Sequence, residues 1–319
     1  MKITRRSFLG GVSGLAAGLA PAAESFAAAA GEMPMRRLGR TGVQVPIIGF
    51  GLAPLGSGRT SSAEADTIVR GAIDMGVTYL DVSPDYGDAE AKLKSPLQGT
   101  RERVFLVTKV NPSAPDAAGV QRQIEASLKR MGVERLDAVH VHNLGDFQMD
   151  MVLGPNGTLA GLKEARRRGL IRFIGTSGHM RPPRFATAIA SGEIDLTMNA
   201  LNFADRHNYD FEGLVLPVAR KHGTAVVAMK VLGGAKNWQY DGHTPATLAD
   251  YHARAIRYSL GLPGVCTAVI GFGNLDEVRQ AAAVARAYRP LTADERADLL
   301  RDGEKLAQAR GLYYGPVSG

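Results

Sequence analysis

Short apolar runs alternate with segments of helical spacing through most of this 319-residue chain, and this alternation constrains the fold more than any other feature. The runs are almost continuously apolar, which is typical of strands buried on both faces of a parallel sheet. Eight such units favour a single-domain (β/α)8 TIM barrel over an open, doubly wound sheet. The predicted strands are Ile47–Gly51, Tyr79–Val82, Val104–Lys109, Ala138–His142, Phe173–Thr176, Leu196–Ala200, Ala225–Met229 and Thr267–Ile270.

Helical segments fill the spaces between these strands, and two extra helices follow the last strand. Arg36–Val45 predicts a small N-terminal hairpin around a Gly-containing turn. Thr292 and Glu295 form a capping box at the start of the final helix. No linker or shift in composition divides residues 31–319, so we expect one domain. The predicted helices are Ala63–Met75, Gly119–Met131, Gly157–Arg168, Arg184–Ala190, Leu214–His222, Pro245–Leu260, Leu275–Ala287 and Thr292–Ala309.

Residues 1–30 have the character of an export signal. Thr4 to Leu9 (TRRSFL) resembles the twin-arginine signal, a weakly apolar stretch follows, and small residues suited to cleavage lie before Gly31. The sequence therefore predicts a twin-arginine signal peptide, recognition by the twin-arginine export machinery and a periplasmic location; a disordered N-terminal tail is the alternative. The apolar stretch is too short and too rich in Gly and Ala for a stable membrane span, so no integral membrane protein is expected.

Composition and charge exclude several classes of function. The formal net charge is +7, but the basic residues are scattered and do not alternate with aromatic residues, so nucleic acid is not an expected partner. Cys266 is the single cysteine, which excludes an internal disulfide and a cysteine-held cluster. We expect its thiol to be buried, and we expect the protein to be a monomer or weakly associated.

Four polar residues lie at or just after the ends of three consecutive predicted strands. Asp81 and Tyr86 follow one strand, Lys109 ends the next, and His142 ends the third. The carboxyl ends of all strands of a parallel barrel open on one face. An ammonium group lowers the pKa of a nearby phenol, and a carboxylate can hold that ammonium by hydrogen bonding. An imidazole can polarise a carbonyl oxygen, so the set predicts proton delivery to a C=O group.

Such a site still needs a source of an electron pair. None of the four residues can provide a hydride, which indicates a nicotinamide cofactor. His140 and His142 point to one face of their strand, so a metal site of the hydrolase type is an alternative. The last strand has no carboxylate to complete such a site, and no metal is expected. His140 is otherwise expected to lie deeper in the barrel and to be hydrogen-bonded.

The chain resembles the aldo-keto reductases from Met35 to about Ala287. The matching segments are MRRLGRTGVQVPIIGFG, TYLDVSPDYG, RVFLVTK, LDAVHVHN, GLIRFIGTSGH and VVAMKVLGG. The resemblance implies a (β/α)8 barrel that reduces aldehydes or ketones, or oxidises the alcohols, with NADP or NAD as cofactor. It also implies that Tyr86 is the general acid, that Lys109 and Asp81 tune it, and that His142 orients the carbonyl.

The resemblance also implies a cofactor site, with departures from the common pattern. Ser177 matches, but Gly178 replaces the usual Asn, Met198 the usual Gln and Met229 the usual aromatic residue. These departures occur together in a branch of the family with SGH and AMK motifs. The other implied cofactor-binding residues are Gly51, Lys230, Leu232, Gly271, Phe272, Gly273, Asn274 and Glu277.

The sequence does not decide between NADP and NAD as cofactor, and it does not identify the substrate. Glu277 stands where a basic residue often grips the 2′-phosphate, and a carboxylate would repel that phosphate. The expected partner is a small-molecule carbonyl or alcohol, and the aromatic candidates for its pocket are Trp238, Tyr240, Tyr313 and Tyr314. A nucleotide-bound sensing protein with slow turnover, like the β subunits of potassium channels, is the alternative to an enzyme.

Overall fold

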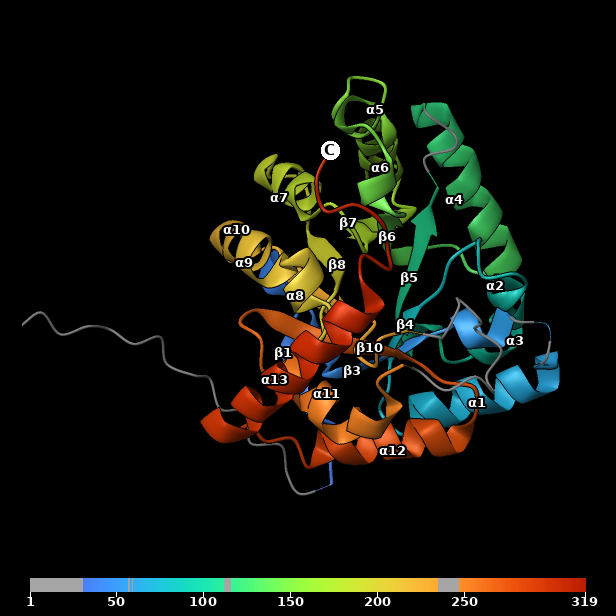
Figure 1. Cartoon of the computed structure of the whole chain (residues 1–319). Helices are drawn as coiled ribbons and strands as arrows, with labels where there is room; N and C mark the ends of the chain where they lie inside the picture. The colour runs from blue at the N-terminus through green and yellow to red at the C-terminus, as the bar shows by residue number, and fades with distance from the viewer. Residues whose placement is uncertain (1–30, 57, 59, 112–115, 235–246) are drawn as a thin grey trace, which may run out of the picture.

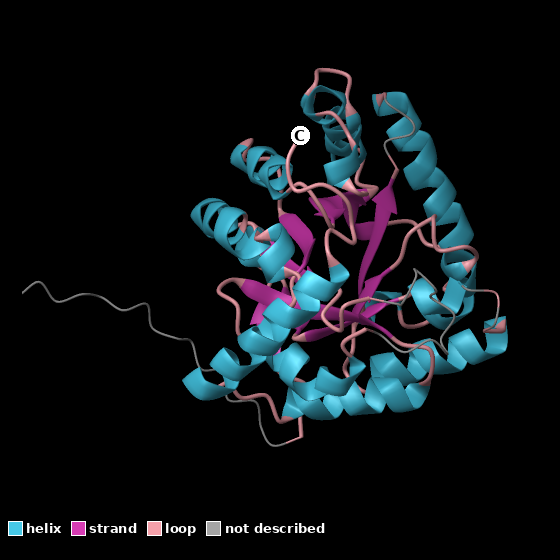
Figure 2. Ribbon diagram, in the orientation of Figure 1, coloured by secondary structure: helices cyan, strands magenta, loops and turns pink. Residues whose placement is uncertain are grey.

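Eight parallel strands close into a barrel with helices around it (Figure 1). This architecture was obtained as a computed structural model, which describes residues 31–56, 58, 60–111, 116–234 and 247–319. The prediction of a (β/α)8 barrel is confirmed, and Figure 2 shows the strands at the centre and the helices outside. The barrel strands are β3 (Ile48–Gly51), β4 (Tyr79–Asp81), β5 (Phe105–Val110), β6 (Leu136–Val141), β7 (Ile171–Gly178), β8 (Leu196–Ala200), β9 (Ala225–Met229) and β10 (Val265–Gly271).

The helices on the outside of the barrel agree closely with the periodicity of the sequence. Thr292 and Glu295 make the predicted capping box, and Gly132 and Gly223 end their helices in the left-handed conformation. The longer helices are α1 (Ser62–Asp74), α4 (Ala117–Met131), α6 (Thr158–Arg167), α7 (Pro182–Ala190), α10 (Leu216–His222), α11 (His252–Leu260), α12 (Leu275–Arg286) and α13 (Ala293–Arg310). Short helices lie in the connections: α2 (Ala89–Lys92), α3 (Lys94–Leu97), α5 (Met149–Leu153), α8 (Arg206–Tyr209) and α9 (Phe211–Leu214).

One predicted helix starts later than expected. The sequence predicts a helix from Pro245, which lies outside the described residues; from Thr247 onward, α11 begins only at His252, after a 3-10 turn over Ala249–Tyr251. The backbone N–H groups of Thr247 and Leu248 donate to carbonyl oxygens of the segment that follows β9, and this pairing holds them outside the helix.

The barrel has an apolar interior that is separate from the core under the helices. Tyr79, Phe105 and Phe173 stack in series inside it, with ring centroids 5.3 and 6.2 Å apart. The N-terminal hairpin, made of β1 (Met35–Arg37) and β2 (Gln44–Pro46), adds Leu38 and Val45 to the same interior cluster. The predicted hairpin therefore packs against one end of the barrel and leaves the carboxyl ends of the strands for the site.

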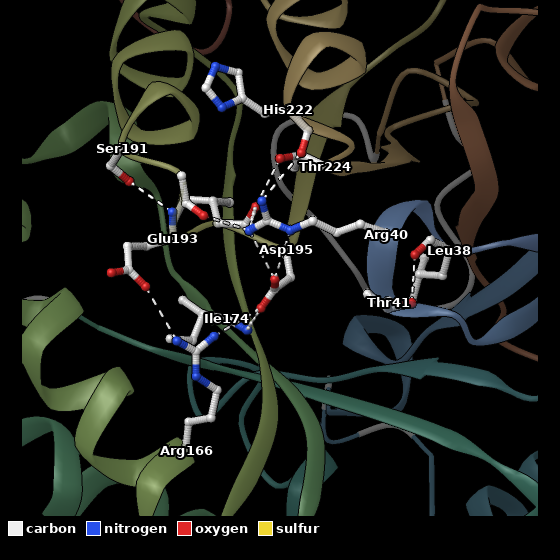
Figure 3. A network of polar contacts seen from close by, with 12 residues as sticks. Leu38, Arg40, Thr41, Arg166, Ile174, Ser191, Glu193, Asp195, His222 and Thr224 are labelled. Atoms are coloured by element: carbon white, nitrogen blue, oxygen red, sulfur yellow. Dashed lines mark hydrogen bonds and ion pairs between the residues drawn. The ribbon is translucent and has the colours of Figure 1, made fainter.

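A charged network ties this hairpin to the barrel (Figure 3). The Arg40 guanidinium donates to the carbonyl oxygen of Gly192 at 2.7 Å and to Asp195 Oδ1 at 3.1 Å. Asp195 Oδ2 in turn accepts from the backbone N–H of Ile174 on β7, at 3.1 Å. One arginine thus joins the hairpin to β7 and to the segment that enters β8.

The predicted signal peptide, residues 1–30, lies outside the described residues. In the part of the chain that is described, no helix combines the length and apolar character needed to cross a membrane.

Candidate active site

The structure brings the four predicted polar residues together at the carboxyl ends of β4, β5 and β6. Asp81 is the last residue of β4, and Lys109 precedes the last residue of β5. His142 follows β6 directly, and Tyr86 lies in the loop that leaves β4. All four side chains are buried or half-buried. Strand order therefore places an acid, a phenol, an amine and an imidazole at one mouth of the barrel.

Lys109 lies between Asp81 and Tyr86. Its Nζ donates to Asp81 Oδ2 at 2.7 Å and to the carbonyl oxygen of Val82 at 2.8 Å, and it lies 4.8 Å from the centroid of the Tyr86 ring. Burial acts to lower the pKa of Lys109, but the negative charge of Asp81 and its hydrogen bond with Lys109 oppose burial, and the pKa of Lys109 lies above the ordinary value. Lys109 is therefore a fixed cation beside the phenol.

The Tyr86 phenol is a protonated group in this site. Burial raises the pKa of Tyr86, and the charge of Lys109 opposes this without reversing it. Lys109 acts to lower the pKa of Tyr86, as the sequence predicts. The expectation that the pKa lies below the ordinary value is wrong for this structure, because removal from water disfavours phenolate more than one cation favours it. A phenol that keeps its proton near neutral pH suits the role of proton donor.

His142 has a partner that the sequence analysis does not single out. Its Nδ1 lies 2.9 Å from Asp85 Oδ2 and 3.4 Å from Ser83 Oγ, and its ring stands edge-on to Tyr86 with centroids 6.3 Å apart. Burial lowers the pKa of His142, and the hydrogen bond with Asp85 partly offsets that effect. Asp85 directly precedes Tyr86 in the loop after β4, and this adjacency to the phenol was the signal available in the sequence.

His140 lies deeper in the barrel, as expected, but it is not hydrogen-bonded as expected. Within the described part of the chain, neither ring nitrogen has a hydrogen-bond partner. The ring packs against Gly175, where a Cβ atom would lie 2.2 Å from its Cδ2. Burial lowers the pKa of His140 well below its usual value. Among the described residues, no three His, Cys, Asp or Glu side chains gather so that they could hold a metal ion.

The predicted cofactor residues lie mostly on the other half of the mouth, at the ends of β7 to β10. Ser177 pairs in register with Met198, and its Oγ donates to the carbonyl oxygen of Val141 at 3.4 Å. Met229 ends β9, and Lys230 follows it with a left-handed φ of 54°. The pKa of Lys230 is lowered to about 7, mainly by burial and secondly by the positive charge of Lys109. The remaining residues of this half are Gly178 at the end of β7 and the half-buried Leu232 after β9.

A glycine loop connects β10 to α12. Gly271 pairs in register with Gly51, which pairs with Asp81, so the loop starts beside the catalytic candidates. A Cβ atom on Gly271 would lie 3.0 Å from the Pro54 side chain, so a larger residue would require Pro54 to shift by a few tenths of an ångström. Phe272 is buried, and Gly273 and Asn274 complete the turn into the helix.

Glu277 closes this loop from the first turn of α12. Its carboxylate accepts from the backbone N–H of Gly273 at 2.7 Å and from Asn274 Nδ2 at 3.1 Å, and Asn274 Oδ1 accepts from the backbone N–H of Glu277. The start of a helix offers free N–H groups to an anion, and here a side-chain carboxylate already uses one nearby donor. The loop therefore carries an acidic residue, and the Gly273 N–H group is already engaged by it.

The C-terminal segment crosses the mouth of the barrel (Figure 1). Tyr314 stacks on His179 with ring centroids 5.0 Å apart, and its Oη donates to Asp205 Oδ2 at 3.1 Å. Arg310 donates to Tyr314 Oη at 2.9 Å. Tyr314 was a predicted pocket residue, whereas His179 and Asp205 were not recognised. Trp238 and Tyr240 lie outside the described residues.

The fold and the site define a barrel with a phenol, a buried cation and an imidazole at the carboxyl ends of its strands, on the same mouth as a glycine loop. The chain belongs to the aldo/keto reductase family, whose profile matches residues 47–248. As a member of this family it is an NAD(P)H-dependent oxidoreductase.

Individual relatives are distant but similar in length. The chain is 24% identical to an L-galactose dehydrogenase of Arabidopsis thaliana, over 83% of this chain and 92% of the relative. It is 26% identical to a pyridoxal 4-dehydrogenase of Microbacterium luteolum, over 77% and 91%. A solved putative aldo-keto reductase of Pseudomonas aeruginosa superposes with a TM-score of 0.67 at 27% identity, over 79% of this chain and 94% of that one. An aldo-keto reductase of Klebsiella pneumoniae in complex with NADPH superposes with a TM-score of 0.69 at 25% identity, over 85% and 95%.

Proposed function

We propose that the protein reduces an aldehyde or ketone, or oxidises the corresponding alcohol, with Tyr86 as general acid. The observation that carries this proposal is the position of Lys109, which is hydrogen-bonded to Asp81 and lies against the Tyr86 ring. A protonated phenol beside a fixed cation can give its proton to a carbonyl oxygen, and the cation stabilises the phenolate that remains.

The other residues of the site support this transfer. Asp81 keeps Lys109 charged and in place, and His142 offers a ring nitrogen to the same substrate oxygen. NADH or NADPH, when bound, supplies the hydride to the carbonyl carbon. The residues that would hold it lie at the ends of β7 to β10, above all Ser177, Lys230 and the loop from Gly271 to Asn274.

The further proposal is that the chain works as an exported member of the SGH and AMK branch. It is supported by Ser177-Gly178-His179 and Ala228-Met229-Lys230, and by the arginine pair, apolar stretch and small residues of the first 30 positions. Replacement of Arg5 and Arg6 by Lys should keep the protein in the cytoplasm. Fractionation of cells that produce both forms tests this, and equal amounts in the periplasm would contradict it.

Tyr86→Phe is the decisive test of the proposed chemistry. The change removes one hydroxyl group, so reduction of an aldehyde should fall by about 10²–10⁴-fold in kcat, the usual contribution of a general acid. Binding of NADH or NADPH, measured by fluorescence titration, should persist, because the phenol is not among the residues that hold the cofactor.

Tyr288→Phe is the matched control. Tyr288 lies away from the mouth and packs against Arg36, so the same loss of a hydroxyl group should leave reduction unchanged. Equal activity of Tyr86→Phe and the wild type would remove the role given to Tyr86. Tight nucleotide binding without any turnover in the wild type would favour the sensing protein over the enzyme.

A further inference from the structure

The contact between Asp85 and His142 determines which ring nitrogen faces the substrate. An ionised carboxylate only accepts hydrogen bonds, and a neutral imidazole carries a proton on one nitrogen only. The hydrogen bond with His142 lowers the pKa of Asp85, so this carboxyl group is ionised near neutral pH. The 2.9 Å contact with Oδ2 is therefore a bond donated by Nδ1–H of His142.

The second ring nitrogen is the one available to a ligand. Within the described part of the chain, Nε2 of His142 makes no hydrogen bond, and it is not sealed from solvent in the way that both nitrogens of His140 are. The His142 ring stands edge-on to the Tyr86 ring, so it borders the phenol that is assigned to proton donation. In the neutral ring, Nε2 carries a lone pair and no proton.

We propose that Asp85 is a positioning residue that keeps the His142 proton on Nδ1 and presents the Nε2 lone pair to the substrate oxygen. The inference rests on the proposed function, because it concerns the same substrate oxygen. An alcohol can donate its hydroxyl hydrogen to this lone pair, whereas a carbonyl oxygen cannot bind to it. The carbonyl form pairs with His142 only when the ring is an imidazolium ion and Nε2 is also a donor.

The two directions of the reaction therefore use opposite protonation states of one residue. Oxidation uses neutral His142, so its kcat/KM should fall as the pH falls through the pKa of His142. Reduction uses the imidazolium form, so its kcat/KM should fall as the pH rises through the same pKa. In reduction, Tyr86 gives its proton to the substrate oxygen and is reprotonated from Nε2–H of the imidazolium ion through the new hydroxyl group. Oxidation is the reverse, so the hydroxyl proton of the alcohol ends on Nε2 of His142, and the hydride would go to or from the nicotinamide cofactor.

Several charged and titratable groups surround His142 and contribute to this pKa. Asp85 raises it and Lys109 lowers it, after the larger lowering by burial. Asp85 and Tyr86 contact the ring from the loop after β4. The other groups that interact with it electrostatically lie on β4, β5 and β6 and in the segments after β6 and β7; they are Asp81, Lys109, His140, Asp146 and His179.

The direct test is the position of the ring proton in the wild-type protein. Nitrogen-15 NMR of histidine side chains distinguishes the two neutral tautomers, and His142→Asn identifies the signal among the 7 histidines. We expect neutral His142 to carry its proton on Nδ1 above its pKa. A proton on Nε2 would overturn the proposal. This outcome is independent of turnover, so it is distinct from a failure of the proposed function, which would show as absent reduction.

Asp85→Asn tests the consequence for catalysis. Loss of the carboxylate removes a group that raises the pKa of His142. The break, which is the pH at which kcat/KM changes in both the oxidation and the reduction profile, should therefore fall by about one unit. Reduction measured above the break should then fall about tenfold at fixed pH. Asp88→Asn is the matched control, because it removes a charge from the same loop at an exposed residue that pairs with Lys92. Breaks that move equally in both variants, or in neither, would overturn the proposal.

Discussion

At the scale of single residues, the buried pair of Asp81 and Lys109 serves the fold as well as the site. Both side chains are almost inaccessible to solvent, at 2% and 1% exposure, and lie 2.7 Å apart. Removal of one partner from a buried pair leaves an uncompensated charge, which costs about 3–5 kcal/mol. Asp81→Asn should therefore lower the free energy of unfolding by that amount in urea denaturation, and should also lower the pKa of Lys109, because burial is then opposed less.

The chain offers a matched surface pair as the control for this prediction. Asp74 and Arg103 form an ion pair of 3.0 Å, but their side chains are 68% and 52% exposed. Exposed pairs contribute about 0–1 kcal/mol. Asp74→Asn should therefore leave the urea midpoint nearly unchanged. If the two variants lost equal stability, the buried pair would have no special structural role.

Residues of the site were predictable to different degrees. Asp81, Tyr86, Lys109 and His142 follow successive apolar strands, so strand order alone brings them to one mouth. Asp85 lies in a loop, and its contact with His142 depends on loop geometry that no periodicity encodes. Tyr314 and His179 are 135 residues apart, and their contact depends on the path of the C-terminal segment across the barrel.

At the scale of elements, the strands were easier to place than the helix starts. Leu196–Ala200 and Ala225–Met229 were predicted with their observed bounds, although only the second is a continuous apolar run and the first contains Thr197 and Asn199. The start of α11 was not predictable, since Thr247 and Leu248 pair with the segment after β9, and their local sequence does not encode that long-range pairing.

The first turn of α12 determines how the loop from Gly271 to Asn274 meets a nucleotide. The Glu277 carboxylate accepts from Gly273 N–H, so an additional phosphate at this loop would meet a negative charge. Glu277→Arg should therefore raise the affinity for NADPH relative to NADH by about tenfold or more, because a hydrogen bond to a charged group contributes about 1.5–3 kcal/mol. Fluorescence titration with both nucleotides measures this ratio.

Asp276→Arg is the control for the charge change. Asp276 precedes Glu277 in the same turn, is 79% exposed and pairs with Arg279. It makes none of the contacts that Glu277 makes with the glycine loop, so the NADPH to NADH ratio should change little. A similar gain in both variants would indicate long-range attraction rather than a specific place for the phosphate.

At the scale of the whole molecule, the two ends of the barrel have separate tasks. The carboxyl ends of the strands carry the polar site, whereas the opposite end is closed by the hairpin and the Arg40 network (Figure 3). Arg40 links the hairpin to Gly192 and Asp195 through charge-assisted hydrogen bonds, but its side chain is 37% exposed. Arg40→Ala should therefore lower the free energy of unfolding by about 1–2 kcal/mol, near the value of one such bond to a charged group.

This separation predicts opposite effects for changes at the two ends. Arg40→Ala should lower the urea midpoint and leave kcat unchanged, because no contact of Arg40 reaches the mouth among the described residues. Tyr86→Phe should abolish most reduction and leave the urea midpoint nearly unchanged. Arg37→Ala, on the exposed edge of the same hairpin, is the control for arginine loss and should change neither quantity. A fall in kcat with Arg40→Ala would mean that strain at the closed end reaches the site through the strands, and the two ends would then form one coupled unit.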